Sequence, residues 1–98
     1  MTLKEKYEFD TLVNEAERLV LEEMEKQLET AEFKNTCRCQ DCILDMAALA
    51  LNNVKPMYRV SLLGSLYTAG VINTPYIEEI RQAVRKAIVK IRENPSHG

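Results

Sequence analysis

The chain has 98 residues, of which 46% are hydrophobic and 29% charged. This length supports one domain with one modest core, which excludes a multi-domain enzyme, and the composition excludes a disordered or collagen-like chain. No apolar run approaches the roughly 20 residues that a membrane span needs, and the charged segment Met1–Asp10 lacks the apolar stretch of a secretion signal. We therefore expect a single soluble domain over residues 1–98, located in the cytoplasm.

The net charge of −2 is unevenly distributed. Residues 1–33 carry 4 basic and 10 acidic side chains (−6), and residues 34–98 carry 9 basic and 5 acidic ones (+4). Nucleic-acid binders concentrate basic residues on one face of a basic domain. The net acidic charge therefore argues against direct DNA binding.

Apolar residues recur every three or four positions in the first third of the chain, as on one face of a helix. The pattern predicts a long helix over about residues 9–31, with Asp10 as its N-cap and an earlier turn at Thr2. Its polar face is rich in glutamate, and we expect these side chains, and the pair Glu22 and Glu23, to be solvated or to dock on a basic partner helix. The glutamates of this face are Glu15, Glu22, Glu25, Glu29 and Glu32.

Two further helices follow. A cysteine loop (33–41) leads to a helix over about residues 42–53, capped by Asp41, whose apolar run Met46–Leu51 predicts burial on most sides. An irregular segment (54–73) includes a short strand or helical turn around Val60. A basic helix over about 75–93 begins at Thr74-Pro75 and ends at Asn94-Pro95, leaving a tail (94–98). These elements predict an all-α or mainly α single domain.

Three cysteines lie within six residues, at Cys37, Cys39 and Cys42. Structural zinc takes four ligands in a tetrahedron, and thiolates at C-x-x-C spacing commonly supply half of such a site. We expect the dipole of the following helix to lower the pKa of Cys42 and so to favour metal binding. The sequence therefore predicts a zinc site at this loop.

The fourth ligand is open at this point. His97 is the one histidine of the chain, and its tail has the length to fold back onto the loop; Asp41, Asp45 or a water are the competing ligands. A redox-sensing thiol pair and inert thiols are the alternatives to a metal site, but the β-α-β pattern of thioredoxin-like proteins is missing.

Motifs that carry catalysis are missing from the sequence. It contains no Gly-rich phosphate loop, no Gly-x-Ser-x-Gly and no His-Glu-x-x-His, and one histidine cannot supply both a general base and its orienting partner. We therefore predict that the protein is not an enzyme.

The motif Cys39-x-x-Cys42-x-x-Asp45, followed by Ala48-Leu49-Ala50-Leu51-Asn52 and Pro56-x-Tyr58, resembles the late competence development protein ComFB family. The resemblance covers nearly the whole chain, including the ending Asn94-Pro95-x-His97. The chain departs from the family pattern at Lys55, at Arg59 and at Leu62-Leu63.

The resemblance implies an α-helical homodimer whose cysteines hold zinc, with His97 as the fourth ligand. It also implies an interaction or regulatory protein associated with DNA uptake in competent bacteria, acting on an unknown protein partner. The alternative that it raises is a receptor for a cyclic dinucleotide, c-di-GMP or c-di-AMP, as in some cyanobacterial members. Arg59, Arg81 and Arg85 would contact the phosphates and guanines, with Tyr58 or Tyr76 stacking. The competing expectation is that Arg81 and Arg85 pair with glutamates of the first helix.

Overall fold

A computed structural model of the chain describes residues 1–60, 70 and 73–95. In order, the elements are α1 (Leu3–Lys6), β1 (Val13–Asn14), α2 (Glu15–Leu28), the 3-10 turn η1 (Ala31–Phe33), α3 (Gln40–Leu51), β2 (Tyr58–Arg59) and α5 (Thr74–Glu93). The predicted mainly α class is confirmed. Every helix in these ranges is too short or too polar to cross a bilayer.

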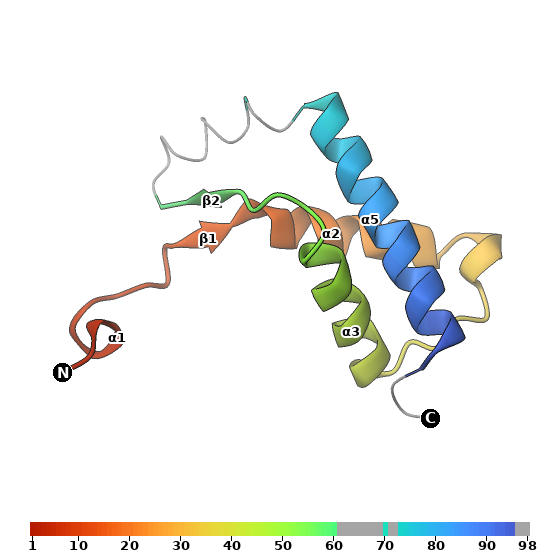
Figure 1. Cartoon of the computed structure of the whole chain (residues 1–98), viewed down its shortest axis with the longest axis horizontal. Helices are drawn as coiled ribbons and strands as arrows, with labels where there is room; N and C mark the ends of the chain where they lie inside the picture. The colour runs from red at the N-terminus through yellow and green to blue at the C-terminus, as the bar shows by residue number, and fades with distance from the viewer. Residues whose placement is uncertain (61–69, 71–72, 96–98) are drawn as a thin grey trace.

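Three helices enclose the core (Figure 1). Helices α3 and α5 lie side by side and run in opposite directions, and α2 crosses both. Each contributes a buried stripe at three- and four-residue spacing, as the periodicity predicted. The buried side chains include Ala16, Val20, Met24 and Leu28 of α2, Cys42, Met46 and Ala50 of α3, and Ile80, Val84, Ala87 and Ile88 of α5.

The predicted helix over residues 9–31 was wrong in its limits. Its N-cap is Asn14, not Asp10, because the Asn14 side chain accepts hydrogen bonds from the Ala16 amide (3.1 Å) and from the Met57 amide (2.7 Å). The second bond belongs to a two-stranded antiparallel ribbon that pairs Val13 with Arg59 and Asn14 with Tyr58. At the other end, the Thr30 hydroxyl donates to the Gln27 carbonyl (2.7 Å) where the helix stops.

The expectation that the glutamates of this helix are solvated was wrong for two of them. Glu15 and Glu23 are 7% and 8% exposed. Glu15 accepts a hydrogen bond from Arg59 of β2 (2.6 Å), and Glu23 accepts one from Gln27 (2.9 Å). Burial of these carboxylates depends on partners that are supplied by tertiary structure and by the next helical turn.

The two later helices also differ in detail from the prediction. Helix α3 begins two residues earlier than expected and is capped by Cys39, and its outer side is open, with Leu44 56% exposed and Ala48 exposed. Helix α5 is capped by Asn73, whose side chain accepts from the Tyr76 amide (3.1 Å), rather than by Thr74. Its end at Asn94 is as predicted. Of the irregular segment, residues 61–69 and 71–72, with Leu62 and Leu63, lie outside the described residues.

Candidate metal centre

The three cysteines converge at the start of α3. Their sulfur atoms all lie within 4.8 Å of one another. Cys42 is buried, Cys37 is half-buried and Cys39 is exposed. Zinc–sulfur bonds of about 2.3 Å in a tetrahedron place two sulfurs about 3.8 Å apart, so small side-chain adjustments bring these thiols to zinc-binding distance. The residues present therefore fit the ion.

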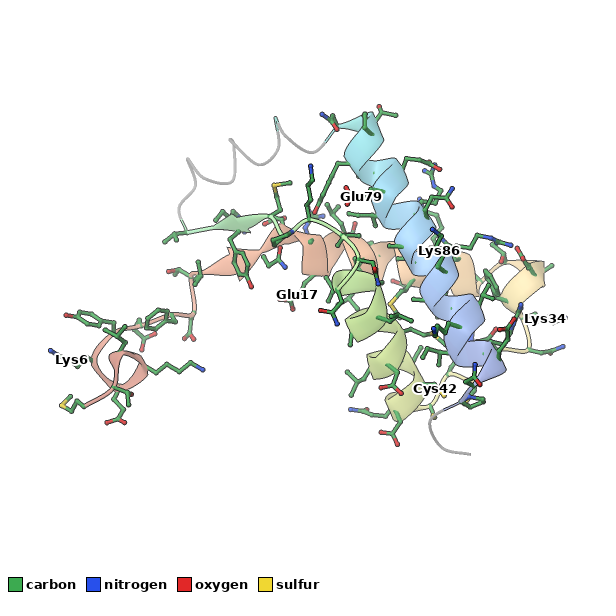
Figure 2. The ribbon with its side chains drawn as sticks, in the orientation of Figure 1. Lys6, Glu17, Lys34, Cys42, Glu79 and Lys86 are labelled. Atoms are coloured by element: carbon green, nitrogen blue, oxygen red, sulfur yellow. The ribbon has the colours of Figure 1, made fainter. Side chains whose placement is uncertain are left out.

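The helix start creates this convergence. Cys39 is the N-cap of α3, and its sulfur accepts a hydrogen bond from the Cys42 amide (3.4 Å), while the Ile43 amide donates to the Cys39 carbonyl (3.0 Å). A residue that caps a helix faces the first turn, which brings the sulfur of Cys39 toward that of Cys42. The C-x-x-C spacing thus places the capping sulfur of Cys39 next to the thiol of Cys42 in the first turn. Figure 2 labels Cys42 at this end of α3.

The two thiols of this pair have opposite electrostatics. The pKa of Cys39 is lowered, mainly because the Cys42 amide donates to its sulfur. Burial, and after it the neighbouring thiols of Cys39 and Cys37, raise the pKa of Cys42 to about 11. The prediction that the helix dipole lowers the pKa of Cys42 was therefore wrong, because the amide at the helix start donates its hydrogen bond to the exposed sulfur of Cys39. A cation at this point would stabilise all three thiolates together.

The loop that carries Cys37 is fixed to the end of α2. The Arg38 guanidinium donates to the carbonyl of Leu28, one of the last carbonyls of that helix. The Thr36 amide donates to the Phe33 carbonyl (3.1 Å), and Thr36 is buried. The sequence analysis gave Arg38 no role, because a single arginine in a loop produces no periodic signal.

Helix α5 holds the same loop from the other side. Phe33 of η1 is 1% exposed, and the guanidinium carbons of Arg85 and Arg92 lie 5.4 and 5.0 Å from its ring centre. Arg92 also donates to the carbonyl of Glu32 (3.3 Å). The last turns of α5 therefore lie against the segment that leads into the cysteines. Phe33 is a single aromatic residue in a loop, and the sequence analysis missed it for that reason.

The predicted fourth ligand, His97, lies outside the described residues. The carboxylates of Asp41 and Asp45 do not belong to the group of donor atoms that lie within 4.8 Å of one another. Among the described residues, that group consists of the three thiols.

The arginines expected to bind a nucleotide each contact a carboxylate. Arg85 donates twice to Glu32 (2.8 and 2.5 Å), and the pair lowers the pKa of Glu32. Glu32 was expected on the first helix but lies in η1, because α2 ends at Leu28. Arg81 pairs instead with Glu78 of its own helix (2.6 Å). Arg81 and Arg85 line one hollow of about 340 Å³ between α2, η1 and α5, whereas Arg59 is on β2. Tyr76 is buried, and its hydroxyl donates to the Lys55 carbonyl (2.7 Å).

Comparison with known proteins identifies the family. The model of the family "Late competence development protein ComFB" matches residues 13–95. The chain belongs to the ComFB family. The resemblance inferred from the cysteine motif is thereby confirmed, and the match begins at β1, so that the preceding twelve residues fall outside it.

A solved structure agrees with this assignment. The late competence protein ComFB from Bacillus subtilis is 29% identical to the chain and superposes with a TM-score of 0.66, covering 87% of this chain and 92% of that one. A search of curated proteins finds no match. The family is associated with competence by its description.

Proposed function

We propose that this ComFB-family chain is a non-enzymatic, zinc-binding homodimer that acts in the cytoplasm as an interaction or regulatory protein associated with competence. The observation that carries the proposal is the convergence of three thiol sulfurs within 4.8 Å at the start of α3. Cys37, Cys39, Cys42 and His97 would hold the ion. Zinc with four protein ligands has no open position for a substrate, so it supplies a structural cross-link.

The position of His97 in the sequence supports its role as the fourth ligand. It follows the last residue of α5, Glu93, by four residues, and four extended residues span at most about 14 Å. The final turns of α5 contact η1, which directly precedes the cysteines. The tail therefore starts at the end of the molecule where the thiols lie.

Zinc at this position would connect three segments that are separate in the sequence: the exit of α2, the start of α3 and the tail after α5. A 98-residue domain has a small core, so a metal that binds the folded chain adds a substantial part of its stability. The protein partner would then recognise a surface whose shape the ion fixes.

Native mass spectrometry of the untagged protein, purified without added metal, tests the proposal. We expect a dimer with two zinc ions, which a chelator removes. Cys39→Ser should lose the metal, His97→Ala should bind it more weakly, and Asp45→Asn should retain it as the matched control. A metal-free protein would contradict the zinc site, and a reversible Cys39–Cys42 disulfide in that protein would assign the thiols to redox sensing.

We infer that the second candidate function is that of a receptor for c-di-GMP or c-di-AMP, because two arginines, Arg81 and Arg85, line the hollow beside α5. The phosphates would have to displace Glu78 and Glu32 from these guanidiniums. Calorimetry with both nucleotides tests it: Arg85→Ala should abolish binding, and Lys34→Ala, with the same loss of charge, should not. No heat with the unchanged protein would contradict this function and leave the zinc site unaffected.

A further inference from the structure

The first twelve residues form an arm whose side chains are all exposed. Figure 1 shows the arm pointing away from the three helices, and Figure 2 places Lys6 at its far end. The arm carries five of the nine large apolar side chains that are exposed in the described part of the chain: Met1 (90%), Leu3 (66%), Tyr7 (59%), Phe9 (42%) and Leu12 (45%). Such a concentration of exposed apolar surface is typical of an interaction site.

The arm is separate from the ComFB domain in sequence and in structure. The family match begins at residue 13, and α1 contributes no buried residue to the core. The hydrogen bonds described for α1 are local: the Glu5 amide donates to the Thr2 side chain (3.3 Å), and the Tyr7 amide donates to the Leu3 carbonyl (2.9 Å). A single helical turn is unstable alone in water, so this segment needs a surface on which to fold.

A groove of suitable chemistry lies between α2 and α3. Its volume is about 320 Å³, and its apolar walls are formed by Leu21, Met24, Leu28 and Ile43. Leu21 is 50% exposed beside it. The exposed carboxylates of Glu25 and Glu29 border the groove together with Arg38, whose guanidinium donates to the Leu28 carbonyl, so the rim keeps a net negative charge. Helix α1 presents Lys4 and Lys6 on either side of Glu5, and so carries a net positive charge. Arm and groove therefore match in both apolar character and charge.

The direction of the chain favours the groove of another copy. In Figure 1, β1 and α2 are nearly collinear, and the arm leaves β1 on the side opposite to α2. The groove residues of α2 lie roughly 9–21 Å along that helix from Glu15, at 1.5 Å per residue. An arm that bound its own groove would have to reverse its course, whereas an arm from a facing copy would not.

We propose that the arm of one chain docks in the α2–α3 groove of a second copy, with Lys4 and Lys6 facing Glu25 and Glu29. The exchange is reciprocal and closes under twofold symmetry. This inference rests on the proposed homodimer and names the segment that completes it.

Charge reversal in the 98-residue chain tests the docking. One variant carries Lys4→Glu with Lys6→Glu, and the other carries Glu25→Lys with Glu29→Lys. In each variant alone, the arm and the groove of the second copy carry charges of the same sign and repel each other. We therefore expect the dimer dissociation constant of each variant, measured by sedimentation velocity, to rise about tenfold. Mixed in equal amounts, the two variants should form a heterodimer of nearly unchanged affinity, since both arm–groove contacts are then complementary.

The control is Lys86→Glu with Lys90→Glu, which makes the same change in charge on α5, away from the arm and the groove; it should dimerise normally. Circular dichroism shows whether each variant is folded. A dimer that neither reversal weakens would overturn the docking and leave the homodimer intact. If the variants become monomeric and mixing them does not restore the dimer, the groove does not bind the arm of a second copy, and the docking proposal is wrong. An unchanged protein that is monomeric at all concentrations would overturn the homodimer itself.

Discussion

The two ends of α2 are held by different kinds of interaction. At its start, Glu15 bonds to Arg59 (2.6 Å) and Arg18 (3.0 Å), and the Glu15 amide donates to the Met57 carbonyl (2.8 Å). At its end, the Arg38 loop leads to three thiols that fit a cation. The chain thus supplies every charge of the ion pairs at the first end, whereas the second end gathers three donor atoms that would need a bound cation to complete the proposed zinc site.

The largest expected effect is on the thiol end. Removal of zinc by a chelator should lower the free energy of unfolding by about 3 kcal/mol, the value for a ligand present well above its dissociation constant, and lower the Tm by roughly 15 °C. Hydrogen exchange should accelerate at the amides of Cys42 and Ile43 and stay slow at that of Met57. Equal acceleration at both ends would contradict the distinction between them.

The next effect concerns the charged end. Glu15→Gln should reduce stability by about 1–2 kcal/mol, because it removes charge-assisted hydrogen bonds and leaves the half-buried Arg59 without a counter-charge. Glu22→Gln is the matched control, since its bond to Arg18 is exposed, and it should change stability by less than about 0.5 kcal/mol. Chemical denaturation measures both, and equal losses would contradict the special position of Glu15.

The same pair predicts a pH dependence. Hydrogen bonds from Arg59, and then from Arg18, hold the pKa of Glu15 below its ordinary value of 4.5. Its contribution is therefore fully present above pH 4.5 and is lost as the pH falls through the lowered pKa. The stability difference between the unchanged protein and Glu15→Gln should shrink over that range. Loss of metal at low pH affects both proteins equally, so it cancels in this difference. A constant difference down to pH 3 would argue against the pair.

The smallest effect is on the contact between η1 and α5. Arg92→Ala removes the guanidinium beside Phe33 and the bond to the Glu32 carbonyl, and should cost about 0.5–1 kcal/mol. Lys90→Ala is the control on the same helix. If zinc affinity, measured by chelator competition, also falls in Arg92→Ala and not in the control, α5 helps to position the cysteine loop. If the zinc affinity of Arg92→Ala is unchanged, Arg92 contributes to the stability of the fold and not to the position of the cysteine loop.

Periodicity and motif together predicted much of this molecule. The buried stripes of α2 and α5 follow from their three- and four-residue spacing, and the cysteines were recognised because soft ligands at short spacing have few other uses. The limits of the helices were harder to predict. Helix α2 begins after Asn14 because the side-chain oxygen of Asn14 accepts a hydrogen bond from the Met57 amide as well as from the helix. Met57 is 43 residues away in the sequence, so no local pattern contains this partner.

The sequence by itself determined the mainly helical class, the family and the three-thiol cluster, because each depends on residues close together in the chain. The folded structure decided which charges are buried, and it lowers the pKa of Cys39 while burial raises that of Cys42. Glu15 and Glu22 look alike on a helical wheel, and only the ribbon that brings Arg59 alongside separates them. Likewise, Cys39 and not Cys42 accepts a hydrogen bond from a helical amide, because α3 starts at Gln40 and the sulfur of its N-cap residue faces the first turn.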